Sequence, residues 1–61
     1  SALKGIKGVG EKTEQRLLLR FGSVARIAAA SEDELAQMVG QKLAVRILNS
    51  LRGDAQEGED N

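Results

Sequence analysis

The chain has 61 residues, enough for one domain and close to the lower size at which a single hydrophobic core holds a chain together. It contains no cysteine and no histidine, so disulfides and the usual structural zinc sites are excluded, and helix packing or a partner must supply the stability. The apolar residues are almost all Leu, Ile, Val and Ala, with Phe21 the only aromatic residue. This composition favours close-packed short helices over a sandwich or a barrel.

The net charge of zero hides an uneven distribution of charge. Residues 1–53 contain all nine Lys and Arg side chains against five carboxylates, a net charge of +4. Residues 54–61 contain four carboxylates and no cation, a net charge of −4, and they have no large apolar side chain to bury. We therefore expect a basic folded domain over residues 1–53, suited to an anionic partner, followed by a disordered acidic tail over residues 54–61.

Membrane contact is not expected. No apolar run approaches the roughly 20 residues that a bilayer-spanning helix needs, and no basic-then-apolar leader stands at the N-terminus. We therefore expect an intracellular protein, in the cytoplasm, nucleoid or nucleus.

The first predicted elements are a short helix, a glycine-rich hairpin and a longer helix. Leu3 and Ile6 are three residues apart, as on one side of a helix, and Lys7-Gly8-Val9-Gly10 interrupts it because glycine favours turn geometry. From Glu11 to Phe21 the apolar residues recur at helical spacing, which predicts a second helix.

Three cations of this second helix form one row. Lys12, Arg16 and Arg20 are spaced i, i+4 and i+8, so they share a face. The row is either a contact surface for an anionic partner or a solvated face, as most charge rows are, and Lys12 is the best candidate for a contact.

Three further helices follow. Gly22 predicts a C-cap, and Ser23 predicts the N-cap of a largely buried connector helix that runs to Ala30. Residues 31–34, Ser-Glu-Asp-Glu, form a predicted capping box at the start of the next helix. That helix is interrupted at Val39-Gly40, after which a final amphipathic helix ends near Gly53. The sequence thus predicts five helices and no β-strand.

The two halves of the chain repeat weakly. Residues 10–18 and 40–48 each begin with glycine and continue with Lys at +2, Arg at +6 and two apolar residues. This offset predicts two pseudo-symmetric units of two helices each, joined by the connector. Two such units could contact two strands of a nucleic acid.

The first unit resembles the helix-hairpin-helix motif in the pattern Leu3-x-x-Ile6-x-Gly8-Val9-Gly10. In the second unit Leu35-x-x-Met38 runs directly into Val39-Gly40, so the hairpin is shorter and lacks the first glycine. From Leu3 to Leu51 the order of these motifs is similar to that of the C-terminal tandem helix-hairpin-helix domain in XPF-type structure-specific nucleases and Hef-type helicase-nucleases. The C-terminal domain of the UvrC excision nuclease is the next most similar. The resemblance implies an all-α, SAM-like fold, similar to domain 2 of RuvA.

The resemblance implies binding to the DNA backbone and minor groove, so that shape and strand polarity rather than bases are recognised. Physical chemistry supports this, because the backbone N–H groups of Gly8, Val9 and Gly10 lie at the N-terminus of a helix, where they suit a phosphate. Flanking lysines add attraction, and a threonine hydroxyl could donate to a phosphate oxygen. The predicted DNA-binding residues are Lys7, Gly8, Val9, Gly10, Lys12, Thr13, Arg16, Gly40 and Lys42. The alternative for the glycines is a tight turn without a ligand.

One residue departs from the repeat, and two other patterns resemble binding sites that the sequence does not support. Glu14 stands where the second unit has Ala44, and its carboxylate either points to solvent or weakens phosphate binding. Residues 5–13 superficially resemble a nucleotide-binding phosphate loop, but Glu11 interrupts the required Gly-Lys step and no parallel sheet can follow. The carboxylates of residues 32–34 could suggest a metal site, but a capping box explains them.

We therefore expect a domain without catalytic residues, cofactor, metal or small-molecule substrate. It would direct a DNA-repair enzyme, a structure-specific endonuclease by resemblance, to duplex, forked or junction DNA, and would pair with an identical or a different subunit. The alternative is a protein-protein dimerisation module with weak or no DNA binding.

Overall fold

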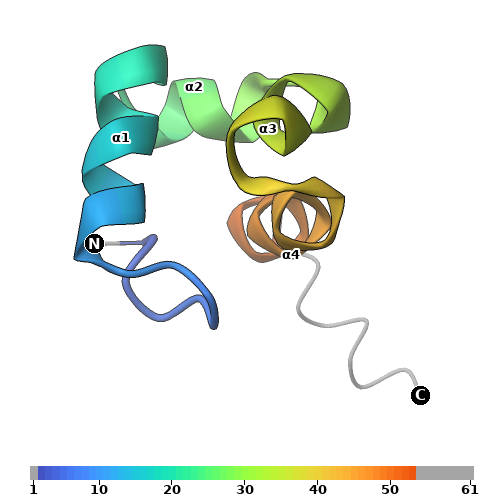
Figure 1. Cartoon of the computed structure of the whole chain (residues 1–61). Coiled ribbons are helices and arrows are strands. Elements are labelled where there is room, and N and C mark those ends of the chain that lie inside the picture. The colour runs from blue at the N-terminus through green and yellow to red at the C-terminus, as the bar shows by residue number, and fades with distance from the viewer. Residues whose placement is uncertain (1, 54–61) are drawn as a thin grey trace.

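The computed structural model of this chain describes residues 2–53, which form four helices and no strand (Figure 1). The helices are α1 (Glu11–Phe21), α2 (Val24–Ala29), α3 (Glu32–Val39) and α4 (Gln41–Leu51). Helix α1 stands along one side, α2 crosses from it to α3, and α3 and α4 pack on each other. No helix within this part of the chain has the length and apolar character that crossing a membrane requires. The acidic tail predicted for residues 54–61 lies outside the described residues.

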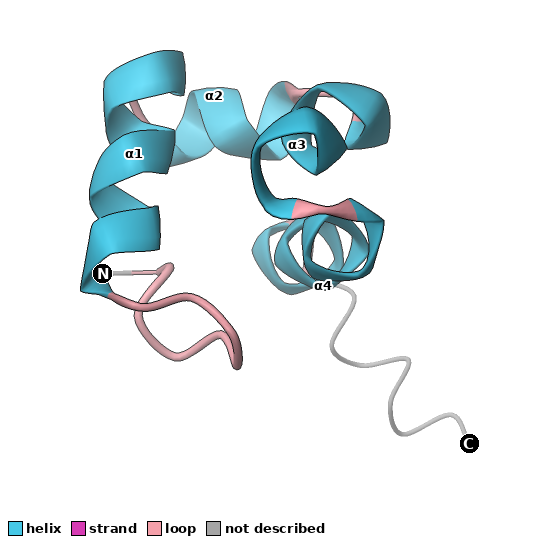
Figure 2. Cartoon of the chain, in the orientation of Figure 1, coloured by secondary structure: helices cyan, strands magenta, loops and turns pink. Residues whose placement is uncertain are grey.

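The prediction of five helices is wrong at the N-terminal end. The segment before α1 is a loop of successive turns, drawn in pink in Figure 2. The N–H of Ile6 donates to the carbonyl of Leu3 at 3.2 Å, and the N–H of Val9 donates to the carbonyl of Ile6 at 3.0 Å. Gly8 has a φ of +97°, which ends any helical continuation. The predicted helix around Leu3 and Ile6 is too short to offset the cost of helix nucleation. The layout is therefore not two matching pairs of helices.

The helix boundaries predicted from capping residues are confirmed. The Gly22 N–H, at a φ of 99°, donates to the Leu18 carbonyl at 2.8 Å and ends α1. The hydroxyl of Ser23 accepts the N–H of Arg26 at 3.1 Å at the start of α2. At the start of α3, Ser31 and Glu34 each accept the other's backbone N–H at 3.1 Å, so the capping box is complete.

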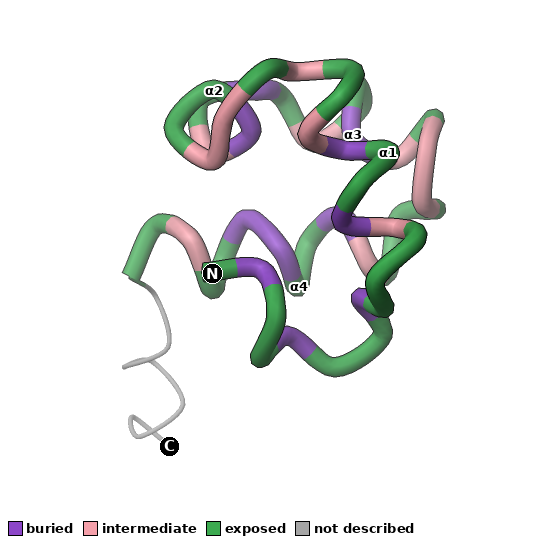
Figure 3. The backbone as a smooth tube through the Cα atoms, turned by 90° about the vertical axis from the view of Figure 1, so that its left-hand side faces the viewer, coloured by how far each residue is buried: buried purple, intermediate pink, exposed green. Residues whose placement is uncertain are grey.

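The core is one cluster to which the N-terminal loop and all four helices contribute, as the purple segments in Figure 3 show. Its fully buried large side chains are Leu3, Leu17, Ile27, Leu35 and Ile47. The connector helix α2 buries only one side, since Ile27 is buried but Val24 is half-buried and Arg26 is exposed. The prediction that it would be largely buried is therefore wrong. Leu19 is outside the core, with 88% of its surface exposed.

An arginine fastens the end of α4 to the end of α2. The Arg52 guanidinium donates from Nε to the Ala28 carbonyl at 2.9 Å and from Nη2 to the Ala30 carbonyl at 3.0 Å. The last carbonyls of a helix have no partner within the helix. Arg52 supplies partners at the C-terminal end of α2 and so joins the two halves of the fold.

Candidate functional site

The loop before α1, residues 7–10, is the predicted hairpin. Only part of its backbone is free to bind a ligand. The Val9 N–H is already donated to the Ile6 carbonyl, and the Val9 side chain is 9% exposed. Val9 therefore anchors the hairpin in the core. Its N–H, which was predicted to help hold a phosphate, already has an acceptor within the loop. Gly8 and Gly10, on either side of it, are both exposed.

The free donors lie one step further along, in the first turn of α1. The first helical hydrogen bond runs from the Glu14 N–H to the Gly10 carbonyl at 2.9 Å, so the N–H groups of residues 11–13 have no acceptor within the helix. Gly10 is the N-cap, and no side chain caps these groups. They lie at the positive end of the helix dipole, where backbone N–H groups suit an anion.

The two hairpin glycines have different reasons to be glycine. Gly8 needs its φ of +97°, and a Cβ added there would lie 3.0 Å from Leu43 Cδ1. Gly10 has an extended backbone, with φ −94° and ψ −175°, and a Cβ added there would meet nothing within 4 Å. The fold therefore explains Gly8 but not Gly10. A missing side chain at Gly10 leaves room for something outside the chain to approach the amides.

Exposed cations surround this helix end. Lys7 precedes the turn, Lys12 lies in the first turn of α1, and Arg16 lies one turn later. None of the three pairs with a carboxylate of residues 2–53. Arg20, the last member of the predicted row, is placed differently, because its guanidinium lies 5.0 Å from the centre of the Phe21 ring. Lys7, Lys12 and Arg16 are therefore available to an anionic ligand.

Glu14 does not point to solvent. Its side chain is only 9% exposed, as the equivalent Ala44 of α4 is fully buried. The solvent-facing interpretation of this residue is therefore wrong. Glu14 thus lies on the buried side of α1.

The second hairpin is built differently from the first. The Gly40 N–H donates to the Ala36 carbonyl at 2.8 Å, and this one residue, at φ 92°, joins α3 to α4. The Gln41 side chain donates from Nε2 to Glu32 Oε2 at 2.8 Å, which holds a carboxylate near the start of α4. Lys42 is exposed beside it. A carboxylate near the positive end of a helix disfavours a second anion there, so the start of α4 is less suited to an anion than the start of α1.

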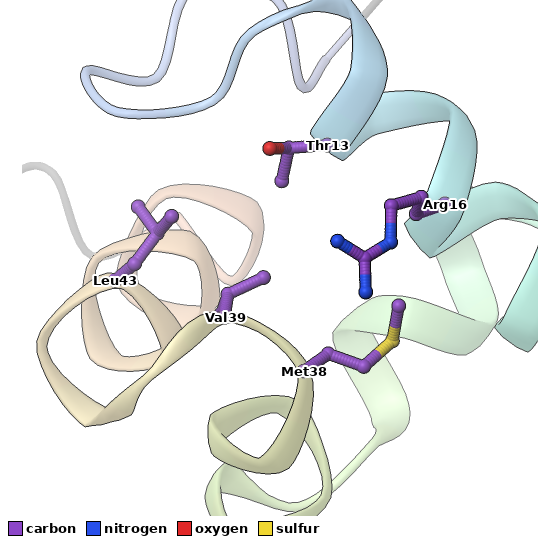
Figure 4. A pocket seen from close by; sticks show the side chains of 5 residues that line it. All are labelled: Thr13, Arg16, Met38, Val39 and Leu43. Carbon is purple, nitrogen blue, oxygen red and sulfur yellow. The ribbon is translucent and has the colours of Figure 1, made fainter.

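A pocket of about 230 Å³ lies between α1 on one side and the junction of α3 and α4 on the other (Figure 4). Its lining residues are Thr13, Arg16, Met38, Val39 and Leu43. Thr13 and Arg16 point into it from α1, and the apolar side chains enter from the end of α3 and the start of α4. The first turn of α1 and the first turn of α4 thus line the same pocket.

The structure gathers six of the predicted residues around one helix end and separates the others. The six residues in or next to the first hairpin are Lys7, Gly8, Val9, Gly10, Lys12 and Thr13. Arg16 follows along α1, whereas Gly40 and Lys42 belong to the second hairpin. The repeat places Arg46 at the position equivalent to Arg16. Its Nη1 donates to the Lys7 carbonyl at 2.9 Å, a bond that sequence reasoning did not predict. No cluster of three acidic, histidine or cysteine side chains that could hold a metal lies within residues 2–53.

Comparison with known proteins identifies relatives of this chain. A family profile described as a SAM-like helix-hairpin-helix tandem matches residues 1–54. UvrABC system protein C of Solibacter usitatus is 50% identical over 48 residues, which are 79% of this chain and 8% of that protein. The protein of the same name from Chlorobaculum tepidum is 50% identical over 54 residues, 87% of this chain and 9% of that protein. That of Bacteroides thetaiotaomicron is 44% identical over 54 residues, 88% of this chain and 9% of that protein.

These matches support the helix-hairpin-helix fold and the likeness to UvrC. They do not confirm the prediction that XPF and Hef proteins are the nearer likeness. The chain spans less than a tenth of the length of these UvrC relatives. No solved structure matches it.

Proposed function

We propose, since this chain belongs to the SAM-like helix-hairpin-helix tandem family, that it binds the phosphate backbone of DNA through its first hairpin. The observation that carries this proposal is the open end of α1. Its three N–H groups without a helical acceptor lie beside Gly10, a glycine that the fold does not require. Lys7 and Lys12, which pair with no carboxylate of residues 2–53, flank them. Amides at a helix N-terminus and lysine side chains are the groups that bind phosphate in proteins.

The binding does not depend on base sequence. The exposed residues of the hairpin offer backbone amides and ammonium groups, and these contact phosphates rather than base edges. Duplex, forked and junction DNA are the proposed ligands, distinguished by the course of the backbone. Lys42 and Gly40 add a weaker second contact. If the domain engages about four phosphates, the logarithm of affinity should fall with the logarithm of salt at a slope of about −4, from about 0.9 per phosphate.

The domain would serve a larger protein. Because the chain corresponds to less than a tenth of its UvrC relatives, a DNA-repair nuclease of the UvrC kind is the proposed parent, and XPF-type and Hef-type proteins are the less supported alternative. The proposed role is to place the nuclease on DNA inside the cell, with the catalytic residues in other domains.

Fluorescence anisotropy with labelled plain and forked duplexes, titrated at several salt concentrations, tests the proposal. The informative variant is Lys12→Gln, and the matched control is Arg26→Gln, which removes the same charge from an exposed position on α2. We expect salt-sensitive binding by the wild type, a shallower salt slope for Lys12→Gln and little change for the control. Absence of binding at low salt, or equal effects of the two variants, would reject the first hairpin as the site.

A second candidate function is self-association. Leu19 is 88% exposed and Val45 is 38% exposed, and exposed apolar side chains favour contact between proteins. A homodimer would carry two copies of the first hairpin, so dimerisation and DNA binding are compatible. Size-exclusion chromatography with light scattering over a range of concentrations tests for the homodimer, because a monomer mass at every concentration would rule it out.

A further inference from the structure

Arg46 belongs to the second half of the chain but lies at the first hairpin. Its Nη1 donates to the carbonyl of Lys7 at 2.9 Å, across 39 residues of sequence. The same nitrogen would lie 3.2 Å from a Cβ added to Gly8. Leu43, one turn earlier on α4, would lie 3.0 Å from that Cβ. Helix α4 therefore supports the turn of the first hairpin with one apolar contact and one hydrogen bond.

The hydrogen bond to Lys7 leaves most of the guanidinium free. Arginine has five N–H donors in a fixed planar arrangement, and the structure uses those of one nitrogen. Arg46 is an exposed residue, and no carboxylate of the described part of the chain pairs with it. The guanidinium carries a full positive charge beside the hairpin, and its remaining donors have no acceptor among residues 2–53.

This placement suits a second function for the same side chain. A guanidinium binds phosphate through two parallel hydrogen bonds, and these are stronger than bonds between neutral groups. A guanidinium that is already held by a backbone carbonyl loses less conformational entropy when it binds. The Arg46 guanidinium also lies beside the turn that carries Lys7, so a phosphate at the hairpin would be attracted by both side chains.

We propose that Arg46 is a ligand of the phosphate that the first hairpin binds, held in position by the Lys7 carbonyl. This inference rests on the proposed function, since it names one more residue of the same site. The second half of the chain then takes part in DNA binding through α4, in addition to its weaker hairpin.

The salt dependence of DNA binding tests the role of Arg46. We compare the wild type with Arg46→Gln and with Arg26→Gln, which removes the same charge on α2 away from the hairpin. Loss of one phosphate contact should make the salt slope of Arg46→Gln shallower by about 0.9 and its affinity about eightfold lower at 0.1 M salt. The slope of Arg26→Gln should stay close to that of the wild type. A weaker affinity with an unchanged slope would show that Arg46 only holds the turn, and would overturn the proposal.

A measurement on the unchanged protein avoids any effect of substitution on folding. The Nε–H resonances of Arg46 and Arg26 are followed by NMR while duplex DNA is added to the wild type. We expect the Arg46 resonance to shift together with the amides of residues 11–13 and the Arg26 resonance to stay in place. An Arg46 resonance that does not move while those amides shift would overturn the inference and leave the proposed function intact. A wild type that does not bind DNA would instead reject the proposed function itself.

Discussion

The substitution Gly10→Asp should stabilise the fold and weaken DNA binding at the same time. Gly10 is the N-cap of α1, with φ −94° and ψ −175° and nothing within 4 Å of an added Cβ. Aspartate is favoured at such a position because its carboxylate accepts the backbone N–H of the second or third helical residue, Lys12 or Thr13. The substitution therefore fills the open helix end from within the chain.

The stabilisation can be worked out from three contributions. Replacing a glycine N-cap by aspartate contributes a few tenths of a kcal/mol, and a carboxylate at the positive end of a helix contributes about 0.3–1 kcal/mol. Removing a glycine from a position without strain contributes about 0.4–1 kcal/mol through the unfolded chain. The total is about 1 kcal/mol or more, which raises Tm by about 4–8 °C in a domain of this size.

DNA binding should change in the opposite direction. The new carboxylate occupies donors that would serve the phosphate and repels the phosphate itself. Loss of one phosphate contact lowers affinity about eightfold at 0.1 M salt, and the repulsion adds to this, so we expect at least about a tenfold loss. Differential scanning calorimetry and fluorescence anisotropy on the same preparation measure the two effects.

Two controls separate charge from position. Ser23→Asp adds the same charge at the N-cap of α2, where the serine hydroxyl already accepts an N–H, and should leave DNA affinity close to that of the wild type. Gly10→Ala adds a side chain without charge and should weaken binding less than Gly10→Asp does. A Gly10→Asp protein that melts at a higher temperature yet binds DNA like the wild type would refute the first hairpin as the phosphate site. A lower Tm would refute the reasoning about the N-cap.

Three further substitutions test the supports of the site. Gly8→Ala should destabilise the fold by about 1–3 kcal/mol in urea unfolding, because its φ is +97° and its Cβ would press on Leu43; an unchanged midpoint would contradict this. Arg52→Ala should cost about 1–3 kcal/mol, since it leaves two carbonyls at the end of α2 without their charged donor, while the salt slope of DNA binding stays the same. Leu19→Gln should change the free energy of unfolding by less than about 0.5 kcal/mol, because this side chain is 88% exposed. A fall in Tm by several degrees would indicate that Leu19 is buried in a dimer in solution.

The parts of the fold that depend on neighbouring residues could be predicted from the sequence. The bounds of α1, Glu11–Phe21, are those that the apolar spacing predicted. The glycine C-cap and the serine caps have the predicted hydrogen bonds, because a cap involves groups only three or four residues apart. The position of the glycine-rich hairpin before a basic helix is also a local pattern, which is why the first site could be located.

The prediction from local spacing failed in the loop before α1, where a short helix was expected. The spacing of Leu3 and Ile6 fits a helix, and both residues are buried as a helix would bury them, but the backbone forms successive turns. A pattern of two apolar residues states which side chains face the core and does not determine the backbone that carries them. The same turns take up the Val9 N–H, whereas the N–H groups of residues 11–13 have no acceptor within the helix.

The sequence by itself determined where the four helices begin, which face of each is apolar, and which glycines and cations lie at the start of α1. Only the tertiary structure decided that Glu14 faces the core, that Gln41 holds Glu32 beside the second hairpin, and that Arg46 reaches the first. The physical reason is distance along the chain. Caps and amphipathic faces depend on residues within about one turn of each other, whereas the bond from Arg46 to Lys7 spans 39 residues and exists only once α4 has packed against the hairpin.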